Sequence, residues 1–147
     1  MYSTFLALHN ILRWLVIFSM LFALIMSVQG LLTKRAYGKM DKLGRIISVS
    51  FVHLQLIIGL ALYGWLSPIM KQFMKEGAGG NEQISFLGIS HFAGMLLAVI
   101  AVTVGSSVAK RAATDQAKFK KVAIWFTVAF ILILVAIPWF RPHFRPF

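Results

Sequence analysis

Residues 8–28 read LHNILRWLVIFSMLFALIMSV. From Trp14 onward this stretch is almost uninterrupted apolar sequence, and about 20 such residues are enough for a helix to cross a membrane. Similar runs follow at about residues 44–66, 84–109 and 122–139. Because these runs are continuous rather than alternating, they favour helices over the strands of a β-barrel. We therefore predict an all-α membrane protein, a four-transmembrane-helix up-down bundle. It forms a single domain over residues 1–147, with the first span at about 4–31.

The composition supports this class and excludes others. Hydrophobic residues make up 59% of the chain, against about 45–50% in soluble domains. The net charge of +11 does not indicate nucleic-acid binding, because basic loops beside membrane spans explain it. The absence of cysteine excludes disulfides, thiolate-bound iron–sulfur clusters and the covalent attachment of a c-type haem. The start lacks the basic region and cleavage site of a secretory signal, so we expect the first segment to remain as a span.

The distribution of basic residues predicts the orientation. Ten lysines and arginines flank the first and third connections: Lys34, Arg35, Lys39, Lys42, Arg45, Lys110, Arg111, Lys118, Lys120 and Lys121. Five lie on the other side: Arg13, Lys71, Lys75, Arg141 and Arg145. The positive-inside rule then places both termini outside and the two basic loops in the cytoplasm.

His9 and Arg13 are the most informative polar residues of the first span. They lie four residues apart, so on a helix they share one face. All four acidic residues fall between the apolar runs. We expect Arg13 either to reach the lipid headgroups or to meet a negative charge that a bound molecule supplies. A haem, with its iron and its carboxylate propionates, would suit both His9 and Arg13.

A second histidine lies at a matching depth. In an up-down bundle, His9 near the start of the first span and His91 near the start of the third fall at a similar level. Those two spans can lie across a diagonal, so the two imidazoles could hold one iron from opposite faces. Gly94, on the same face as His91, would leave room for the ring. His53 lies on the order of 10 Å from the level of His9 and His91, at 1.5 Å rise per residue. We therefore keep it only as an alternative ligand.

Each residue also has a simpler interpretation. His9 could be solvated by headgroups, and His53 and His91 could hydrogen-bond neighbouring helices. Gly94 belongs to a row of small residues on one face that could serve helix packing alone. We assign no role to His143, in the proline-rich tail.

Four stretches resemble a known family: LHNILRW within residues 2–14, LQLIIGLALYGWLSPI at 54–69, SHFAGMLLAVI at 90–100 and KVAIWFTVAFILILVAIPW at 121–139. Together they resemble small bacterial four-span membrane proteins labelled cytochrome b or b-type cytochrome-like, over nearly the whole chain. The resemblance implies a four-helix bundle in the bacterial inner membrane that binds haem b. The family's histidines fall on His9 and His91, while the position of His53 does not reliably carry histidine.

We therefore predict a haem b-binding membrane protein in one-electron transfer. It would be an electron carrier or a subunit of an oxidoreductase rather than a stand-alone enzyme. Its partners would be the lipid bilayer and a quinol or a respiratory complex, in a homo- or hetero-oligomer. The main alternative is a cofactor-free accessory or scaffold subunit of a larger membrane complex. A small transporter is a third reading, but spans without acids offer few groups to bind a cation. No catalytic motif of a hydrolase or kinase is present.

Overall fold

The structure is a computed structural model that describes residues 1–79 and 81–139. These residues form helices and connections, without a strand among them. Helix α1 (Tyr2–Thr33) is followed by α2 (Lys39–Ala61), whose last turns widen into a π-helix, η1 (Leu62–Leu66). Short elements come next: α3 (Pro68–Glu76), the 3-10 turn η2 (Gly77–Gly79) and α4 (Glu82–Ser85). A second π-helix, η3 (Phe86–His91), leads into α5 (Phe92–Lys110), and α6 (Asp115–Ala136) completes the described fold.

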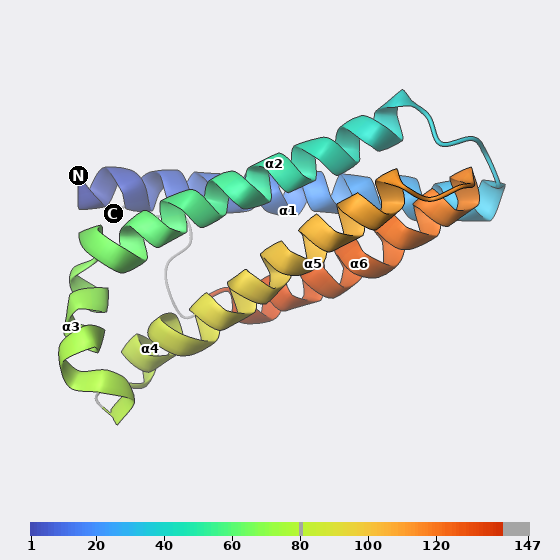
Figure 1. Ribbon diagram of the computed structural model, residues 1–147. Coiled ribbons are helices and arrows are strands. Elements are labelled where there is room, and N and C mark those ends of the chain that lie inside the picture. Colours follow the sequence, from blue (N-terminus) through green and yellow to red (C-terminus); the bar gives the residue numbers. More distant parts are fainter. Residues whose placement is uncertain (80, 140–147) are drawn as a thin grey trace.

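The predicted bundle is confirmed. Four continuous helices are long and apolar enough to span a membrane: Tyr2–Thr33, Lys39–Leu66, Glu82–Lys110 and Asp115–Ala136. Figure 1 shows them running side by side, with α3 across the end where α1 begins and α6 ends. Helices α1 and α5 each pack against α2 and α6, so they lie across the bundle diagonal. The diagonal arrangement that the sequence allowed for the first and third spans is therefore the one the protein adopts.

The connection between the second and third spans lies between the apolar runs predicted at 44–66 and 84–109, and it contains a helix of its own, α3 (Pro68–Glu76). Ser67 ends η1 and also caps α3, because its hydroxyl accepts a hydrogen bond from the Met70 N–H. Proline at the first helical position is typical of a helix start. The Ser-Pro pair that terminates one helix therefore begins the next.

The fourth helix is displaced from its predicted bounds of 122–139. It begins at Asp115, where the Thr114 hydroxyl accepts from the Ala117 N–H, and it ends at Ala136. Ile137 is extended (ψ 131°), as expected for a residue that precedes proline. The tail with Arg141, His143 and Arg145 lies outside the described residues.

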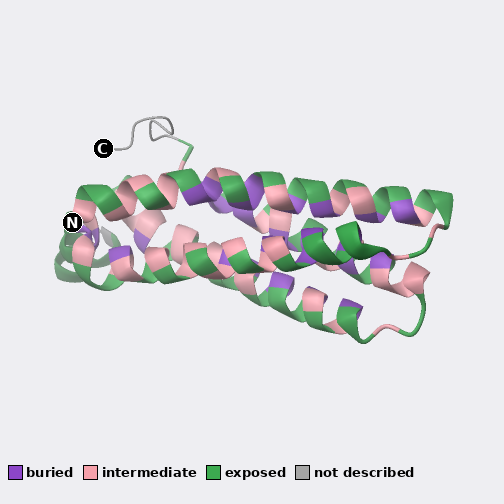
Figure 2. Ribbon diagram, turned by 90° about the horizontal axis from the view of Figure 1, so that it is seen from above, coloured by how far each residue is buried: buried purple, intermediate pink, exposed green. Residues whose placement is uncertain are grey.

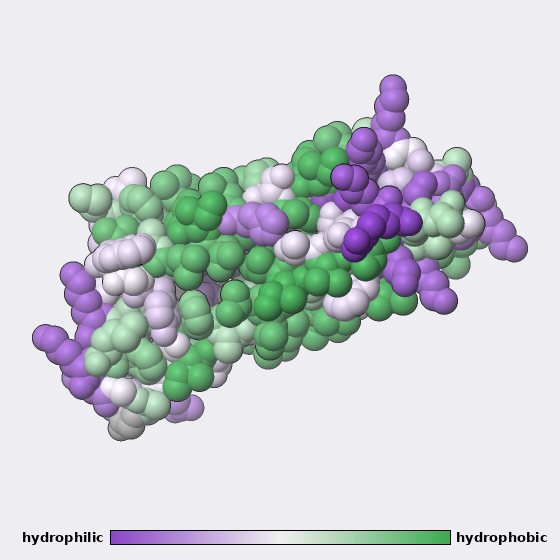
Figure 3. Space-filling view, in the orientation of Figure 1, coloured by the Kyte–Doolittle hydropathy of each residue, from purple (hydrophilic) through white to green (hydrophobic). Residues whose placement is uncertain are grey.

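The surface has the polarity that a membrane requires. Large apolar side chains face outward along the helices, including Ile57 (63% exposed) and Val135 (73% exposed). The interior is small and central, with Met20, Val102 and Phe126 fully buried. Figure 2 shows the buried positions along the inner faces of the helices, and Figure 3 shows an apolar band over the middle of the molecule. The chain is a multi-pass membrane protein.

Basic residues gather at the end of the bundle opposite α3 (Figure 3). Arg35 makes a two-pronged ion pair with Asp41, with nitrogen–oxygen distances of 2.6 and 2.7 Å. The hydrogen bond from Arg35 to Asp41 raises the pKa of the Arg35 guanidinium above its ordinary value. Arg45 is buried and donates to the backbone oxygen and hydroxyl of Ser106 on α5. These contacts join the connection after α1 to α2, and α2 to α5, at this end.

Candidate functional site

The candidate site lies near the α3 end of the bundle, where two π-helices interrupt the regular helices. A π-turn contains more residues than an α-turn, and such turns are frequent at functional sites. The first, η1, carries Tyr63, and the second, η3, ends at His91. The Tyr63 hydroxyl donates to the Gly88 carbonyl over 3.0 Å, and the Tyr63 ring stacks on Phe92 with centroids 4.5 Å apart. These contacts join the end of the second spanning helix to the start of the third.

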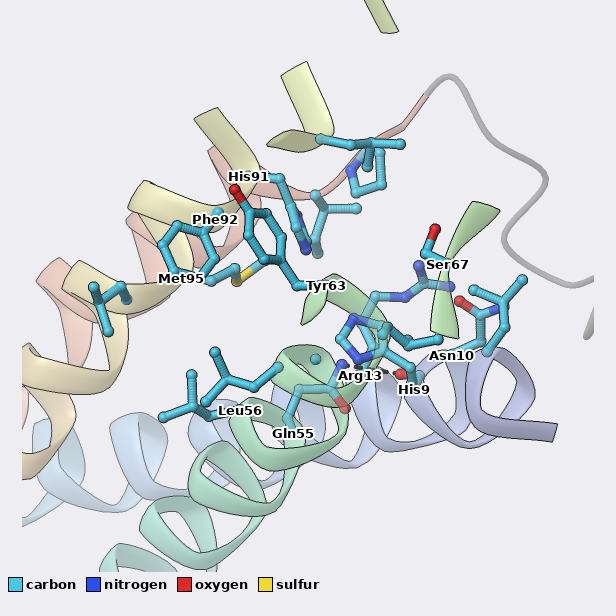
Figure 4. A pocket seen from close by; sticks show the side chains of 18 of the residues that line it. His9, Asn10, Arg13, Gln55, Leu56, Tyr63, Ser67, His91, Phe92 and Met95 are labelled. Carbon is cyan, nitrogen blue, oxygen red and sulfur yellow. Dashed lines mark hydrogen bonds between the residues drawn. The ribbon is translucent and has the colours of Figure 1, made fainter. Parts of the chain in front are cut away.

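His9 and His91 face one another across the interior. Their ring centroids are 6.3 Å apart, and the ring planes are inclined by 67°. His9 comes from α1 and His91 from the last residue of η3, so the pair joins the two diagonal helices (Figure 4). The structure thus brings the two histidines together at one level of the bundle.

The hydrogen bond of His91 defines which of its nitrogens is available. Nδ1 of His91 lies 2.8 Å from the Ala136 carbonyl oxygen. A carbonyl oxygen can only accept, so Nδ1 carries the proton in this contact. In a neutral imidazole the other nitrogen, Nε2, then keeps its lone pair. A backbone partner of this kind is common for a histidine that binds a metal through its second nitrogen.

His9 is held against α2. The Gln55 side-chain amide donates to the His9 carbonyl oxygen over 2.9 Å. A side chain at Gly59 would place its Cβ 3.4 Å from His9 Cε1, so the glycine lets the imidazole lie close to α2. Nδ1 of His9 and Oε1 of Gln55 are buried without a hydrogen-bond partner among the described residues. Buried polar atoms normally have a partner. The two atoms can therefore bind a water or a polar group of a ligand.

A cavity of about 430 Å³ lies beside the histidine pair. This volume falls in the range of about 300–1,000 Å³ that is typical of ligand sites. His9, Arg13 and His91 all line it, and Arg13 is 9% exposed, with its guanidinium carbon 5.8 Å from the Trp14 ring centre. Leu60 of α2 and Leu96 of α5 also line the cavity, yet they are 42% and 39% exposed. The cavity therefore has polar groups inside and an apolar side that reaches the lipid-facing surface.

Two sequence predictions do not match the positions in the structure. Gly94 does not line the cavity but faces α6, where an added Cβ would lie 2.8 Å from the Ala136 Cβ. Its small size serves the close approach of α5 and α6. His53 also lies outside the cavity lining, and its Nε2 is 2.8 Å from the Thr103 hydroxyl on α5. This interhelical hydrogen bond corresponds to the simpler interpretation of His53.

Sequence reasoning missed the contribution of α2. Gln55, Gly59 and Tyr63 are spaced four residues apart and line one side of the cavity. Gln55 is the one amide side chain within residues 44–66, and polar side chains in membrane helices usually face a neighbouring helix. That signal could have indicated the face of the second span. No side chain in the sequence indicated that the Ala136 backbone carbonyl would contact His91 Nδ1.

The donor set limits the metal that this site could hold. Within the described part of the chain, no group of three or more His, Cys, Asp or Glu side chains is arranged to bind a metal. A metal held by His9 and His91 would therefore need its remaining ligands from a bound molecule. Two imidazoles that share one metal at about 2 Å per bond have ring centres roughly 6 Å apart, which matches the 6.3 Å observed. A haem, whose iron already has four nitrogen ligands, is a group that two imidazoles at this spacing would complete.

Comparison with protein-family models, curated proteins and solved structures finds no match to this chain. The resemblance to b-type cytochromes accordingly stays a prediction. The fold and the site define a class: a four-helix, multi-pass membrane protein with a histidine pair beside an internal cavity.

Proposed function

We propose that the protein binds one haem b between His9 and His91 and transfers single electrons in the membrane. The spacing of the two imidazole rings, 6.3 Å between centroids across the bundle diagonal, carries this proposal. The His91 Nδ1 contact with Ala136 adds support, because it directs the lone pair of Nε2 away from α6. The bound iron would supply a one-electron couple between its ferric and ferrous states.

The chain's own residues would set the properties of that couple. His9 and His91 would both ligate the iron, and two protein ligands suit electron transfer better than oxygen chemistry. Arg13, one turn along α1 from His9, would meet a propionate through a charge-assisted hydrogen bond. Met95 and Val99 of α5 line the cavity and would keep water from the ring. The apolar side at Leu60 and Leu96 gives a route of entry from the lipid and brings the cavity close to partners dissolved in the membrane.

We also propose an orientation in the bacterial inner membrane. The basic end of the bundle lies in the cytoplasm, because lysine and arginine are retained there during insertion. The start of α1 and helix α3 then lie outside, which places the histidine pair near the outer face. A quinol or a redox complex in the membrane would exchange electrons from that side.

The test is the visible spectrum of protein purified in detergent after expression with added haem. We expect a Soret band, a reducible α band and the pyridine haemochrome spectrum of haem b. His9→Ala and His91→Ala should each lose the bound haem, because each variant would remove one of the two protein ligands that hold the iron. His53→Ala is the matched control, since His53 lies outside the cavity, and it should keep the spectrum.

Two outcomes would contradict this function. Colourless wild-type protein after haem supplementation would favour a cofactor-free scaffold subunit. Full haem content in His9→Ala or His91→Ala, with unchanged helical circular dichroism, would exclude this pair as the ligands.

A further inference from the structure

The end of α6 supplies the carbonyl oxygen that His91 contacts, and the local conformation of the chain leaves this oxygen free to accept. In a continuing α-helix the Ala136 carbonyl would accept from the N–H four residues further on. Instead α6 ends at Ala136, and Ile137 adopts an extended conformation before Pro138. Proline has no N–H and restricts the preceding residue. The Ala136 oxygen is therefore one of the unsatisfied carbonyls at the helix C-terminus, and His91 Nδ1 lies 2.8 Å from it.

Gly94 sets the distance between the two elements. It follows His91 by three residues, about one helical turn, and faces the same end of α6. A Cβ at this position would lie 2.8 Å from the Ala136 Cβ, which is closer than such atoms pack. Any larger residue would move α5 away from the carbonyl that His91 contacts. Gly94, on α5, and Pro138, just after the end of α6, thus act on the same hydrogen bond between His91 and Ala136.

The chemistry of this contact determines the state of the imidazole. The carbonyl accepts, so Nδ1 must carry the proton, and the negative end of the α6 dipole strengthens the interaction. In water a neutral imidazole prefers the opposite tautomer, with the proton on Nε2. The protein environment therefore selects the less common form, in which Nε2 is a base.

We propose that Gly94, the Ala136 carbonyl and Pro138 are a positioning device that holds His91 as its Nδ1–H tautomer, with Nε2 prepared to bind a metal. The preparation of Nε2 to bind a metal rests on the proposed haem function, but the tautomer itself is a property of the protein without haem. Gly94 and Pro138 are positioning residues, because they act through His91 and not on the ligand.

The experiment is a two-bond hydrogen–nitrogen NMR correlation on haem-free protein labelled with nitrogen-15 in histidine. This measurement distinguishes the two tautomers, and His91→Gln identifies the His91 signals by their loss. We expect the Nδ1–H pattern for wild-type His91. Gly94→Ala and Pro138→Ala should each shift His91 toward the Nε2–H pattern. Gly64→Ala is the control, because a Cβ there meets no atom within 4 Å, and it should leave the pattern unchanged.

Haem affinity gives a second reading. Loss of an outer partner of a metal ligand typically weakens binding roughly 10–100-fold, and we expect this loss in both positioning variants. An Nε2–H tautomer in wild-type protein would overturn the inference, as would an unchanged tautomer in both variants. If either Gly94→Ala or Pro138→Ala fails to fold, the other variant and the wild-type spectrum still test the assignment of the tautomer. Nδ1–H protein that binds no haem would overturn the proposed function alone, whereas haem bound by Nε2–H protein would overturn the inference alone.

Discussion

Polar residues inside the membrane helices of this protein fall into two groups. His53 finds a partner on a neighbouring helix, with its Nε2 2.8 Å from the Thr103 hydroxyl, and it adds an interhelical contact. His9, Arg13 and His91 instead line one cavity from two diagonal helices. Ionisable groups at membrane depth are costly and usually functional. The position beside a cavity, rather than the residue type, separates the second group from the first.

Arg13 provides a test at the scale of one residue. In the haem-loaded protein proposed above, its positive charge disfavours the ferric state, which carries one more positive charge than the ferrous state. Arg13→Leu should therefore lower the midpoint potential, by roughly 30–60 mV on a scale where 59 mV is a tenfold change for one electron. Arg13→Lys keeps the charge and should shift the potential less. Redox titration followed at the α band measures both, and equal potentials in wild type and Arg13→Leu would contradict a contact between Arg13 and a propionate.

At the scale of the elements, contact between α5 and α6 depends on small residues. Water does not drive helices together inside a bilayer, so close packing of backbones carries much of the association. Gly105 shows this closeness, because a Cβ there would lie 2.3 Å from the Trp125 Cβ. Gly94 makes the same kind of approach to Ala136 at the other end of the pair. Gly94 and Gly105 therefore serve the packing of α5 against α6, and neither of them lines the cavity.

Substitution of Gly105 tests this packing. Gly105→Ala should destabilise the protein by about 1–3 kcal/mol, because the two helices must separate to admit the methyl group. Gly64→Ala adds the same methyl group where no atom lies within 4 Å, and it should be neutral or slightly stabilising because alanine favours a helix. Unfolding of both variants in mixed detergent micelles, followed by circular dichroism, measures the difference. Similar stabilities for the two variants would contradict close packing at Gly105.

At the scale of the whole molecule, charge and chemistry lie at opposite ends. Most of the basic residues and the Arg35–Asp41 ion pair occupy one end, and the cavity with its two histidines lies near the other, beside α3. The orientation in the membrane therefore decides on which side electrons would enter or leave.

The chain has no cysteine, so single cysteines can report this orientation cleanly. Ser3 and Ala113 are both exposed and lie at opposite ends of the bundle. With a membrane-impermeant maleimide, we expect Ser3→Cys to react in intact spheroplasts and Ala113→Cys to react only after lysis. The reverse pattern would place the basic loops outside and the histidine pair near the cytoplasm.

The amino-acid sequence was enough to predict the four helices, their membrane character and the common level of His9 and His91. Apolar runs of spanning length leave helices as the way to satisfy the backbone, and a bundle of alternating helices puts residues of matching depth at one level. The sequence did not predict α3, because its nine residues are too few to form a spanning run.

The surroundings of the pair could not be predicted: Gln55 and Gly59 against His9, the Ala136 carbonyl on His91, and Gly94 against α6. The reason is geometric. Each of these contacts joins two different helices, and the spacing of residues along one helix gives neither the distance nor the rotation of its neighbour. A backbone carbonyl also acquires its role from where a helix stops and what packs beside it, which depends on the whole fold.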